Sequence, residues 1–261
     1  MFTAFRSESP LQSPAESTSC KPGKVLVLIP TYNEAESVCP LVDKLQELDC
    51  VDYILVVDDS SVDGTLEKLA VLQEKYDNLF VHQRPGKLGL GTALRDGFRL
   101  ALKRFPFSRL VQMDGDLSHD PSSIPQMLLS RADVVVGSRY VEDGRIIGWN
   151  FYRKNLSREA NFLTRTLLGL RIRDVTSGFR VYSRRAVEIL VREANCGGYE
   201  FQVEAVWLAK KHGLDVEELP ITFTERLRGK SKLQGSSEVK KLLIFTVKQA
   251  WRRWLDKISW S

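Results

Sequence analysis

The sequence has no run of about 18 consecutive apolar residues, which is the shortest run that predicts a helix spanning a bilayer. Its four cysteines, Cys20, Cys39, Cys50 and Cys196, lack the C-x-x-C spacing of zinc sites and are typical of free thiols in a reducing compartment. Residues 1–23 are rich in Ser, Pro and Glu and lack the apolar core of a signal peptide, which predicts a disordered tail. We therefore expect a cytoplasmic protein.

Charge of one sign is not in large excess, because 38 Lys and Arg face 33 Asp and Glu, a net charge of +5 over 261 residues. We expect no nucleic-acid partner. The excess is local: residues 226–257 contain ten Lys or Arg against two acids. Such a segment is either a solvated face or a surface that meets an anionic membrane.

Apolar, β-rich runs alternate with amphipathic stretches over the first half of the chain. The predicted strands are residues 24–30, 53–59, 79–82, 109–114 and 132–138, and the predicted helices between them are 37–49, 63–76 and 91–105. This order predicts an α/β fold with a mostly parallel sheet covered by helices on both faces.

The alternation stops after Gly148, where a long amphipathic helix is predicted at residues 153–170. We expect one catalytic domain over 24–235 and a separate amphipathic helix over 236–261. The apolar stripe of that helix comprises Val239, Leu243, Val247, Trp251, Trp254 and Ile258, with Lys240, Lys241, Lys248 and Arg252 opposite. This stripe either lies in a membrane interface or packs on the catalytic domain.

Acidic side chains follow three of the predicted strands. Glu34 comes after the first, Asp58 and Asp59 end the second, and Asp114 and Asp116 end the fourth. The carboxyl ends of parallel strands share one edge of the sheet, where ligands bind. The Asp114–Gly115–Asp116 turn therefore predicts a site for Mg²⁺ or Mn²⁺, which take carboxylate and phosphate oxygens. The alternative is a turn with two solvated acids.

Two neighbouring segments favour a nucleotide beside this metal site. In "DDSSVDGT" (58–65), Asp59 is placed to bind a base or ribose hydroxyl, while Asp63 caps the next helix. In "PGKLGLGTALRDG" (85–97), a glycine-rich turn leads into a helix, and its backbone amides and Lys87 are placed to hold a phosphate.

Seven motifs in order resemble a known family: "PTYNE" (30–34), "DDSSVDGT" (58–65), "KLGLGTA" (87–93), "DGDLSHDP" (114–121), "GSRY" (137–140), "SGFRVY" (177–182) and "GKSKL" (229–233). They are similar to those of the GT-A glycosyltransferases of family 2, specifically the polyprenol-phosphate (dolichol-phosphate) mannosyltransferases. The likeness covers about residues 24–235. It implies the Rossmann-like GT-A fold and transfer of mannose from GDP-mannose to a polyprenyl (dolichyl) phosphate, with inversion.

The resemblance also implies roles for single residues. Pro30, Tyr32, Glu34, Asp59, Lys87 and Asp114 would line the nucleotide pocket, and Asp114 and Asp116 would hold the metal on the diphosphate. The family often has Gln where this chain has Ser118. Because serine is shorter, water is the alternative third ligand at that point.

The resemblance assigns the acceptor phosphate to basic residues in the second half of the chain. Arg139, Arg153, Ser157 and Arg226 stand at the matching positions, and a guanidinium matches the geometry of phosphate oxygens. Asp116 and the three arginines would then carry catalysis. An ionised phosphate acceptor needs no general base. The implied setting is the cytoplasmic face of a membrane, with a small membrane-anchor subunit as a further partner.

Other readings of the motifs exist. "DGDLS" approaches the D-x-D-x-T/V nucleophile motif of haloacid-dehalogenase phosphatases, but it follows the fourth predicted strand rather than the first. A sugar-nucleotide-binding subunit without turnover would have little need of the intact acid pair and the three arginines. Within the enzyme class, transfer of glucose or another sugar from a UDP-sugar is the alternative, because the motifs specify the diphosphate better than the sugar.

Overall fold

The computed structural model describes residues 23–225 and 235–258. The tail predicted at 1–23 therefore lies, apart from Gly23, outside the described residues, as do Arg226 and the rest of the basic segment up to residue 234. Side chains of the last helix are described from Lys240 to Trp251.

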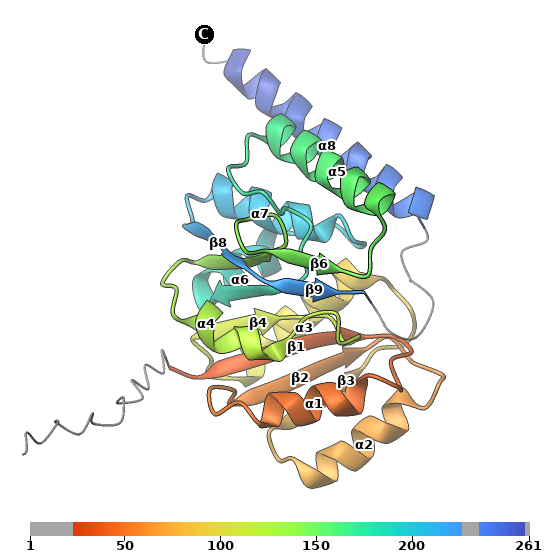
Figure 1. Ribbon diagram of the computed structural model, residues 1–261. Helices are drawn as coiled ribbons and strands as arrows, with labels where there is room; N and C mark the ends of the chain where they lie inside the picture. The colour runs from red at the N-terminus through yellow and green to blue at the C-terminus, as the bar shows by residue number, and fades with distance from the viewer. Residues whose placement is uncertain (1–22, 226–234, 259–261) are drawn as a thin grey trace, which may run out of the picture.

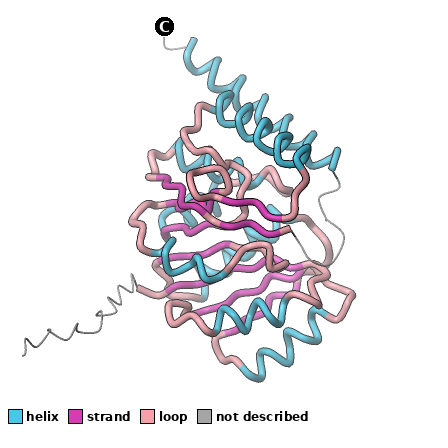
Figure 2. Tube along the Cα trace, in the orientation of Figure 1, coloured by secondary structure: helices cyan, strands magenta, loops and turns pink. Residues whose placement is uncertain are grey.

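A single large sheet forms the centre of the fold (Figures 1 and 2). Its seven strands run in the order β3-β2-β1-β4-β7-β5-β8. They are β1 (Val25–Thr31), β2 (Tyr53–Asp58), β3 (Leu79–Gln83), β4 (Arg109–Gln112), β5 (Val134–Ser138), β7 (Arg180–Ser183) and β8 (Val216–Pro220). All neighbours pair in parallel except β7, which is antiparallel to β4 and β5. The predicted α/β class with a mostly parallel sheet is confirmed.

Helices cover both faces of the sheet, as Figure 1 shows. The helices are α1 (Val38–Gln46), α2 (Thr65–Lys75), α3 (Leu90–Arg104), α4 (Ile124–Leu128, after the 3₁₀ turn Pro121–Ser123), α5 (Phe151–Leu168), α6 (Arg184–Glu193), α7 (Phe201–Lys211) and α8 (Gly235–Ile258). Apolar residues of α1, α2 and α4 form one core cluster with the sheet, and those of α3, α6 and α7 form the other. The apolar strand runs are therefore buried on both sides.

The register of the parallel strands brings their carboxyl ends to one edge. Thr31 at the end of β1 pairs with Asp58 at the end of β2. The Thr31 hydroxyl donates a hydrogen bond of 2.7 Å to the Asp58 carboxylate. Asp58 is fully buried and also accepts bonds from Ser61. Asp58 thus fixes the ends of β1 and β2 together, while Asp59 follows at the rim.

Two features of the fold were not predicted. Strand β7 inserts between β4 and β5, so the predicted fourth and fifth strands are not neighbours. A two-stranded parallel pair, β6 (Arg145–Ile147) with β9 (Thr222–Thr224), lies beside the main sheet. Both pairings join segments more than 40 residues apart, and local sequence patterns carry no information on such contacts.

Helix α5 exposes several large apolar side chains and buries two polar ones. Six large apolar residues are exposed on it: Phe151, Tyr152, Leu156, Phe162, Leu163 and Leu167. Its buried positions include Asn161 and Thr164. Among the described helices, none is long and apolar enough to cross a bilayer.

Helix α8 lies beside α5 and also exposes large apolar side chains (Figure 1). Leu242 and Phe245 are buried in the core, whereas Leu243, Val247 and Trp251 of the predicted stripe are exposed. The alternative that the stripe packs on the catalytic domain is therefore wrong for these three residues. Val239, Trp254 and Ile258, the other members of the stripe, have side chains outside the described set.

Candidate active site

A cavity of about 640 Å³ opens where β1, β2 and β4 end. Nine residues that the sequence placed in a site line it: Pro30, Tyr32, Glu34, Asp59, Lys87, Asp114, Asp116, Arg139 and Arg153. Segments from residue 30 to residue 153 thus converge on one cavity. Ser157 is not among its lining residues, and Arg226 lies outside the described residues.

The turn after β4 holds the two acids in a defined arrangement. One oxygen of Asp116, Oδ1, accepts hydrogen bonds from the Ser118 amide at 2.9 Å and the Ser118 hydroxyl at 2.5 Å. Leu117 takes a positive φ of 61°, which closes the turn. Ser118 therefore orients Asp116 here, and its hydroxyl is used within the turn. This geometry favours the alternative in which water replaces a third protein ligand.

The space around Asp114 suits a metal-bound ligand. A Cβ atom added at Gly178 would lie 3.2 Å from both Asp114 carboxylate oxygens, so the glycine leaves room at this carboxylate. The Asp114 side chain is 33% exposed. Within residues 23–225 and 235–258, no group of three or more His, Cys, Asp or Glu is placed to hold a metal. Two carboxylates fit Mg²⁺ or Mn²⁺ if substrate phosphate and water complete the shell.

The imidazole of His119 packs beneath this turn. Its Nδ1 accepts a hydrogen bond from the Asp114 amide at 3.3 Å, and the ring stacks on Phe179 with centroids 5.1 Å apart. Burial lowers the pKa of His119, although Asp114 and Asp116 oppose this effect. His119 therefore acts as a neutral support for the Asp114 backbone.

Asp59 is buried against a cation that the sequence analysis missed. Its Oδ1 forms an ion pair with Arg84, and its Oδ2 accepts from the amides of Leu88 and Gly89 at 3.1 and 3.2 Å. Arg84 follows β3, the strand next to β2, so the order of strands could have indicated this pair. Asp59 therefore anchors the segment that carries Lys87, whose Nζ lies 4.3 Å from the Tyr32 ring centroid.

The glycines at the start of α3 allow its backbone to lie close to the backbone of Gly197. The Gly91 amide donates to the Gly197 carbonyl at 3.0 Å, and a Cβ at Gly89 would lie 2.6 Å from that oxygen. The amides of residues 88, 89 and 91 are therefore already bonded within the protein, and Lys87 stays a phosphate-binding candidate of the segment.

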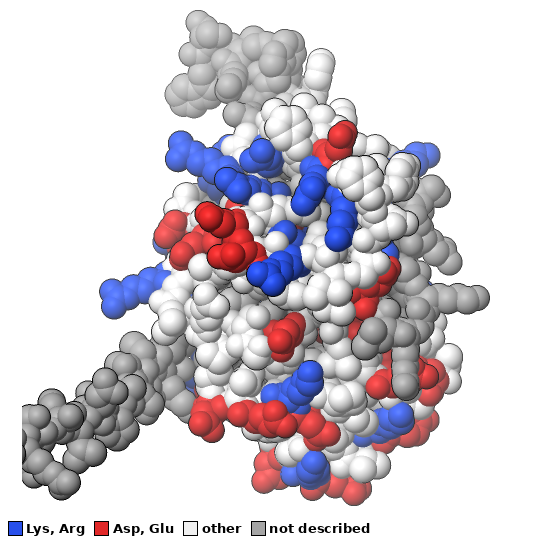
Figure 3. Space-filling model, in the orientation of Figure 1, with Lys and Arg blue, Asp and Glu red and all other residues white. Residues whose placement is uncertain are grey.

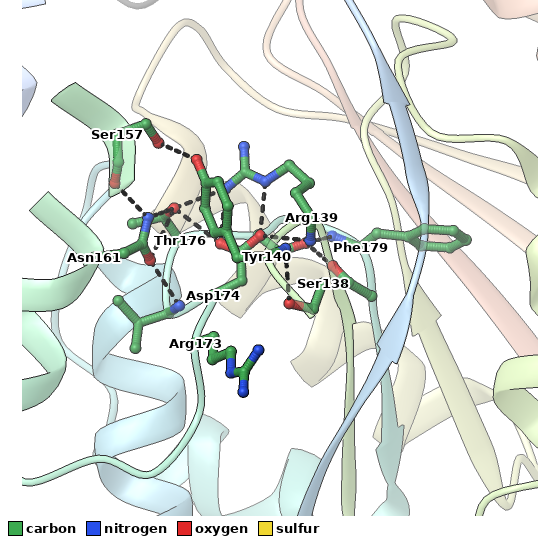
Figure 4. A network of polar contacts seen from close by, with 12 residues as sticks. Ser138, Arg139, Tyr140, Ser157, Asn161, Arg173, Asp174, Thr176 and Phe179 are labelled. Carbon is green, nitrogen blue, oxygen red and sulfur yellow. Dashed lines mark hydrogen bonds and ion pairs between the residues drawn. The ribbon is translucent and has the colours of Figure 1, made fainter. Parts of the chain in front are cut away.

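Arg139 also lines the cavity and lies in a network of polar contacts (Figure 4). It is 6% exposed and makes two hydrogen bonds of 2.7 Å to the carboxylate of Asp174. Burial acts to lower the pKa of Arg139, but the Asp174 charge outweighs it and raises the pKa above the ordinary arginine value. Arg139 is therefore a permanent, oriented cation.

Arg153 and Ser157 point to different places, although both stand on α5. Arg153 forms an ion pair with Glu225 and its Cζ lies 4.3 Å from the Trp149 ring centroid. The Ser157 hydroxyl instead accepts a hydrogen bond of 2.7 Å from the Tyr140 hydroxyl. Arg153 reaches the cavity directly, whereas Ser157 supports the segment that follows Arg139.

A model of the glycosyl transferase family 2 domain matches residues 26–190, which include all the strand-end acids. The chain belongs to glycosyl transferase family 2. The polyprenol monophosphomannose synthase of Mycolicibacterium smegmatis is 42% identical to it over 221 residues, 82% of this chain and 82% of the relative. The undecaprenyl-phosphate mannosyltransferase of Micrococcus luteus is 38% identical over 217 residues, 81% of this chain and 88% of the relative.

Solved structures confirm the GT-A fold of this family 2 member. Glucosyl-3-phosphoglycerate synthase from Mycobacterium tuberculosis, in complex with UDP, superposes with a TM-score of 0.66 at 18% identity, over 94% of this chain and 86% of that one. The same enzyme in complex with Mn²⁺, UDP-glucose and phosphoglyceric acid also gives a TM-score of 0.66, at 18% identity over 88% of this chain and 80% of that chain. At this identity the likeness concerns the fold.

Proposed function

We propose that this glycosyltransferase transfers mannose from GDP-mannose to a polyprenyl (dolichyl) phosphate, with inversion at the sugar carbon. One observation carries the proposal: the acid pair Asp114 and Asp116 and the cations Arg139 and Arg153 line the same cavity. Such a site can hold a nucleotide diphosphate on one side and a second phosphate on the other. The names of the two relatives, a polyprenol monophosphomannose synthase and an undecaprenyl-phosphate mannosyltransferase, support this choice of sugar and acceptor.

The donor side comprises the residues at the ends of β1, β2 and β4. Pro30, Tyr32, Glu34, Asp59 and Lys87 line the nucleotide pocket in this proposal. Asp114 and Asp116 would hold Mg²⁺ or Mn²⁺, which supplies positive charge to the departing diphosphate. Glucosyl-3-phosphoglycerate synthase, which shares this fold, was solved with Mn²⁺, and this supports the proposal of a divalent metal here. The Lys87 ammonium group adds a further positive charge beside the diphosphate.

The acceptor side needs no proton transfer. A phosphate monoester is ionised near neutral pH, so its oxygen attacks the anomeric carbon while the bond to the diphosphate breaks and GDP leaves with the electron pair. Arg139 and Arg153 would hold the attacking phosphate in line and offset the repulsion between two anions. Ser157 would support the acceptor site through its hydrogen bond with Tyr140. Arg226 stays a proposed ligand of the acceptor phosphate on the basis of the sequence.

The lipid acceptor explains the exposed apolar faces of α5 and α8. Phe151 and Tyr152 are 80% and 75% exposed at the start of α5, within one turn of Arg153. Basic side chains gather on the part of the surface around α5 (Figure 3). We propose that these faces contact the cytoplasmic side of a membrane, as interfacial helices do. A small membrane-anchor subunit is the other partner that would cover them.

Vesicle sedimentation distinguishes between a membrane and an anchor subunit as the partner of these faces. The chain alone should sediment with vesicles that contain phosphatidylglycerol, and the double variant Phe151→Ser with Tyr152→Ser should not. Val71→Ser on α2, where the wild-type side chain is 65% exposed, is the matched control. If the chain alone stays in solution, a second protein rather than lipid covers α5.

The release of GDP tests the transfer itself. With GDP-mannose and Mg²⁺ or Mn²⁺, GDP should be released rapidly only after a polyprenyl phosphate is added. Equal release with and without the lipid phosphate would indicate a hydrolase. A lack of release under both conditions would favour a binding subunit without turnover.

A further inference from the structure

Asp174, which the sequence analysis did not single out, lies between α5 and β7 with no exposed surface. Its Oδ2 accepts from the Arg139 Nε at 2.7 Å and its Oδ1 from the Arg139 Nη2 at 2.7 Å. The Arg139 amide also donates to Oδ2 at 3.1 Å. Two parallel bonds of this kind fix the plane of a guanidinium as well as its place.

Asp174 is itself held from the edge of the sheet. Glu218 on β8 accepts from the Asp174 amide at 2.8 Å through Oε1 and from the Arg173 amide at 2.6 Å through Oε2. The segment that carries Asp174 therefore cannot shift without breaking bonds to β8. The sheet therefore fixes the Arg139 guanidinium through Glu218 and Asp174.

A second support comes from the polar inner face of α5. Thr176 accepts a hydrogen bond of 2.8 Å from the Arg139 Nη2. Asn161 on α5 donates to the Thr176 hydroxyl at 3.1 Å and accepts from the Val175 amide at 2.9 Å. Figure 4 shows these groups gathered around Arg139. Asn161 and Thr176 thus support the Arg139 cation from the side of α5.

Three aromatic rings also lie close to Arg139. Its Cζ lies 5.3 Å from the ring centroid of Tyr140, 5.6 Å from that of Trp149 and 5.5 Å from that of Phe223. Removing the carboxylate would leave a buried charge without its partner, and the guanidinium would turn away to find another.

We propose that Asp174 is a positioning residue, which aims Arg139 at the acceptor phosphate. The inference rests on the proposed transfer to a polyprenyl phosphate. Burial acts to raise the pKa of Asp174, but the Arg139 charge and hydrogen bonds outweigh it and keep the pKa low. Asp174 is thus an anion that compensates Arg139 without contacting the substrate.

Kinetics with a water-soluble short-chain polyprenyl phosphate test the inference. Asp174→Asn should raise the KM of this acceptor about tenfold or more, because a bond to a charged partner is lost, and leave the KM of the nucleotide sugar unchanged. In the background of Arg139→Ala, Asp174→Asn should add nothing to the acceptor KM. Thr176→Val, a milder change, should raise the acceptor KM about two- to tenfold.

Val187→Ala is the control for lost stability, because Val187 is buried on α6 away from the cavity. It should lower the melting temperature and leave both KM values unchanged. A merely structural Asp174 would behave like this control, or would raise both KM values equally, and either result overturns the inference. If Asp174→Asn does not fold, an unchanged acceptor KM in Thr176→Val overturns it.

Direct binding separates this inference from the proposed function. Affinity for the short-chain polyprenyl phosphate, measured by calorimetry without nucleotide sugar, should fall in Asp174→Asn. A wild type that neither binds this lipid phosphate nor uses it as acceptor would contradict both proposals. A wild type that binds and uses it, with unchanged binding in Asp174→Asn, would contradict the positioning role alone.

Discussion

Arg153 and Glu225 form an ion pair at the edge of the cavity, with side chains 36% and 38% exposed. Both residues line the cavity, and Arg153 also packs against Trp149. A phosphate that binds Arg153 must share the guanidinium with the Glu225 carboxylate or displace it. Glu225 therefore competes with the acceptor that we propose.

Replacing Glu225 by Gln should lower the KM of the lipid phosphate about two- to fivefold, since partly exposed ion pairs are worth little. The change removes one negative charge and keeps the side-chain shape. Initial rates against the concentration of polyprenyl phosphate give the value. A higher KM would mean that Glu225 helps to bind the acceptor.

Replacing Arg153 by Ala should raise the acceptor KM by about 10- to 150-fold, because a hydrogen bond between charged groups contributes roughly 1.5–3 kcal/mol. The KM of the nucleotide sugar should stay within about twofold, a shift small against that range. Arg165→Ala, three turns further along α5, is the matched control. An equal rise for both substrates would assign Arg153 to the fold or to the donor.

Replacing Asp116 by Asn should lower the transfer rate at least about 100-fold, as the loss of a group that stabilises developing charge does. EDTA should abolish wild-type transfer, and added Mn²⁺ or Mg²⁺ should restore the wild type but not the variant. Calorimetric titration with Mn²⁺ and GDP checks binding apart from activity. Asp120→Asn, an exposed acid of the same loop, is the control. Full activity in EDTA would refute the metal site.

Replacing Arg84 by Ala should lower the free energy of unfolding by about 3–5 kcal/mol, because the carboxylate of Asp59 would stay buried without its cation. The Arg84 side chain is 2% exposed and that of Asp59 7%. Urea denaturation measures the change. Arg99→Ala, which removes an exposed partner of Asp96, should cost less than about 1 kcal/mol. Equal losses in the two variants would contradict a structural role for Arg84.

Strands β1, β2 and β3 were predictable because each is a local apolar run followed by an amphipathic helix. Strand β7 was not, since "RVYS" is four residues long and contains Arg180, which is fully buried. The Arg180 guanidinium donates hydrogen bonds to the carbonyls of Ser177 and Val175. These bonds form only once the chain has folded. Such a strand has no apolar signature of its own.

The strand-end acids were predictable from the geometry of parallel sheets, but their partners were not. Arg84 lies 25 residues from Asp59, and Asp174 lies 35 residues from Arg139. The sequence pattern also did not show that α5 buries Asn161 and Thr164 while it exposes large apolar residues, because an amphipathic pattern does not say which side is covered. The neighbours of α5 decide that.

The most direct test of the account is the identity of the product formed under competition. The chain is supplied with equal concentrations of GDP-mannose and UDP-glucose, a divalent metal, and vesicles that contain polyprenyl phosphate, and the lipid product is analysed by mass spectrometry. We expect polyprenyl-phosphate-mannose as the dominant product, formed in proportion to the GDP released. A lipid-linked glucose, or free mannose without a lipid product, would contradict it.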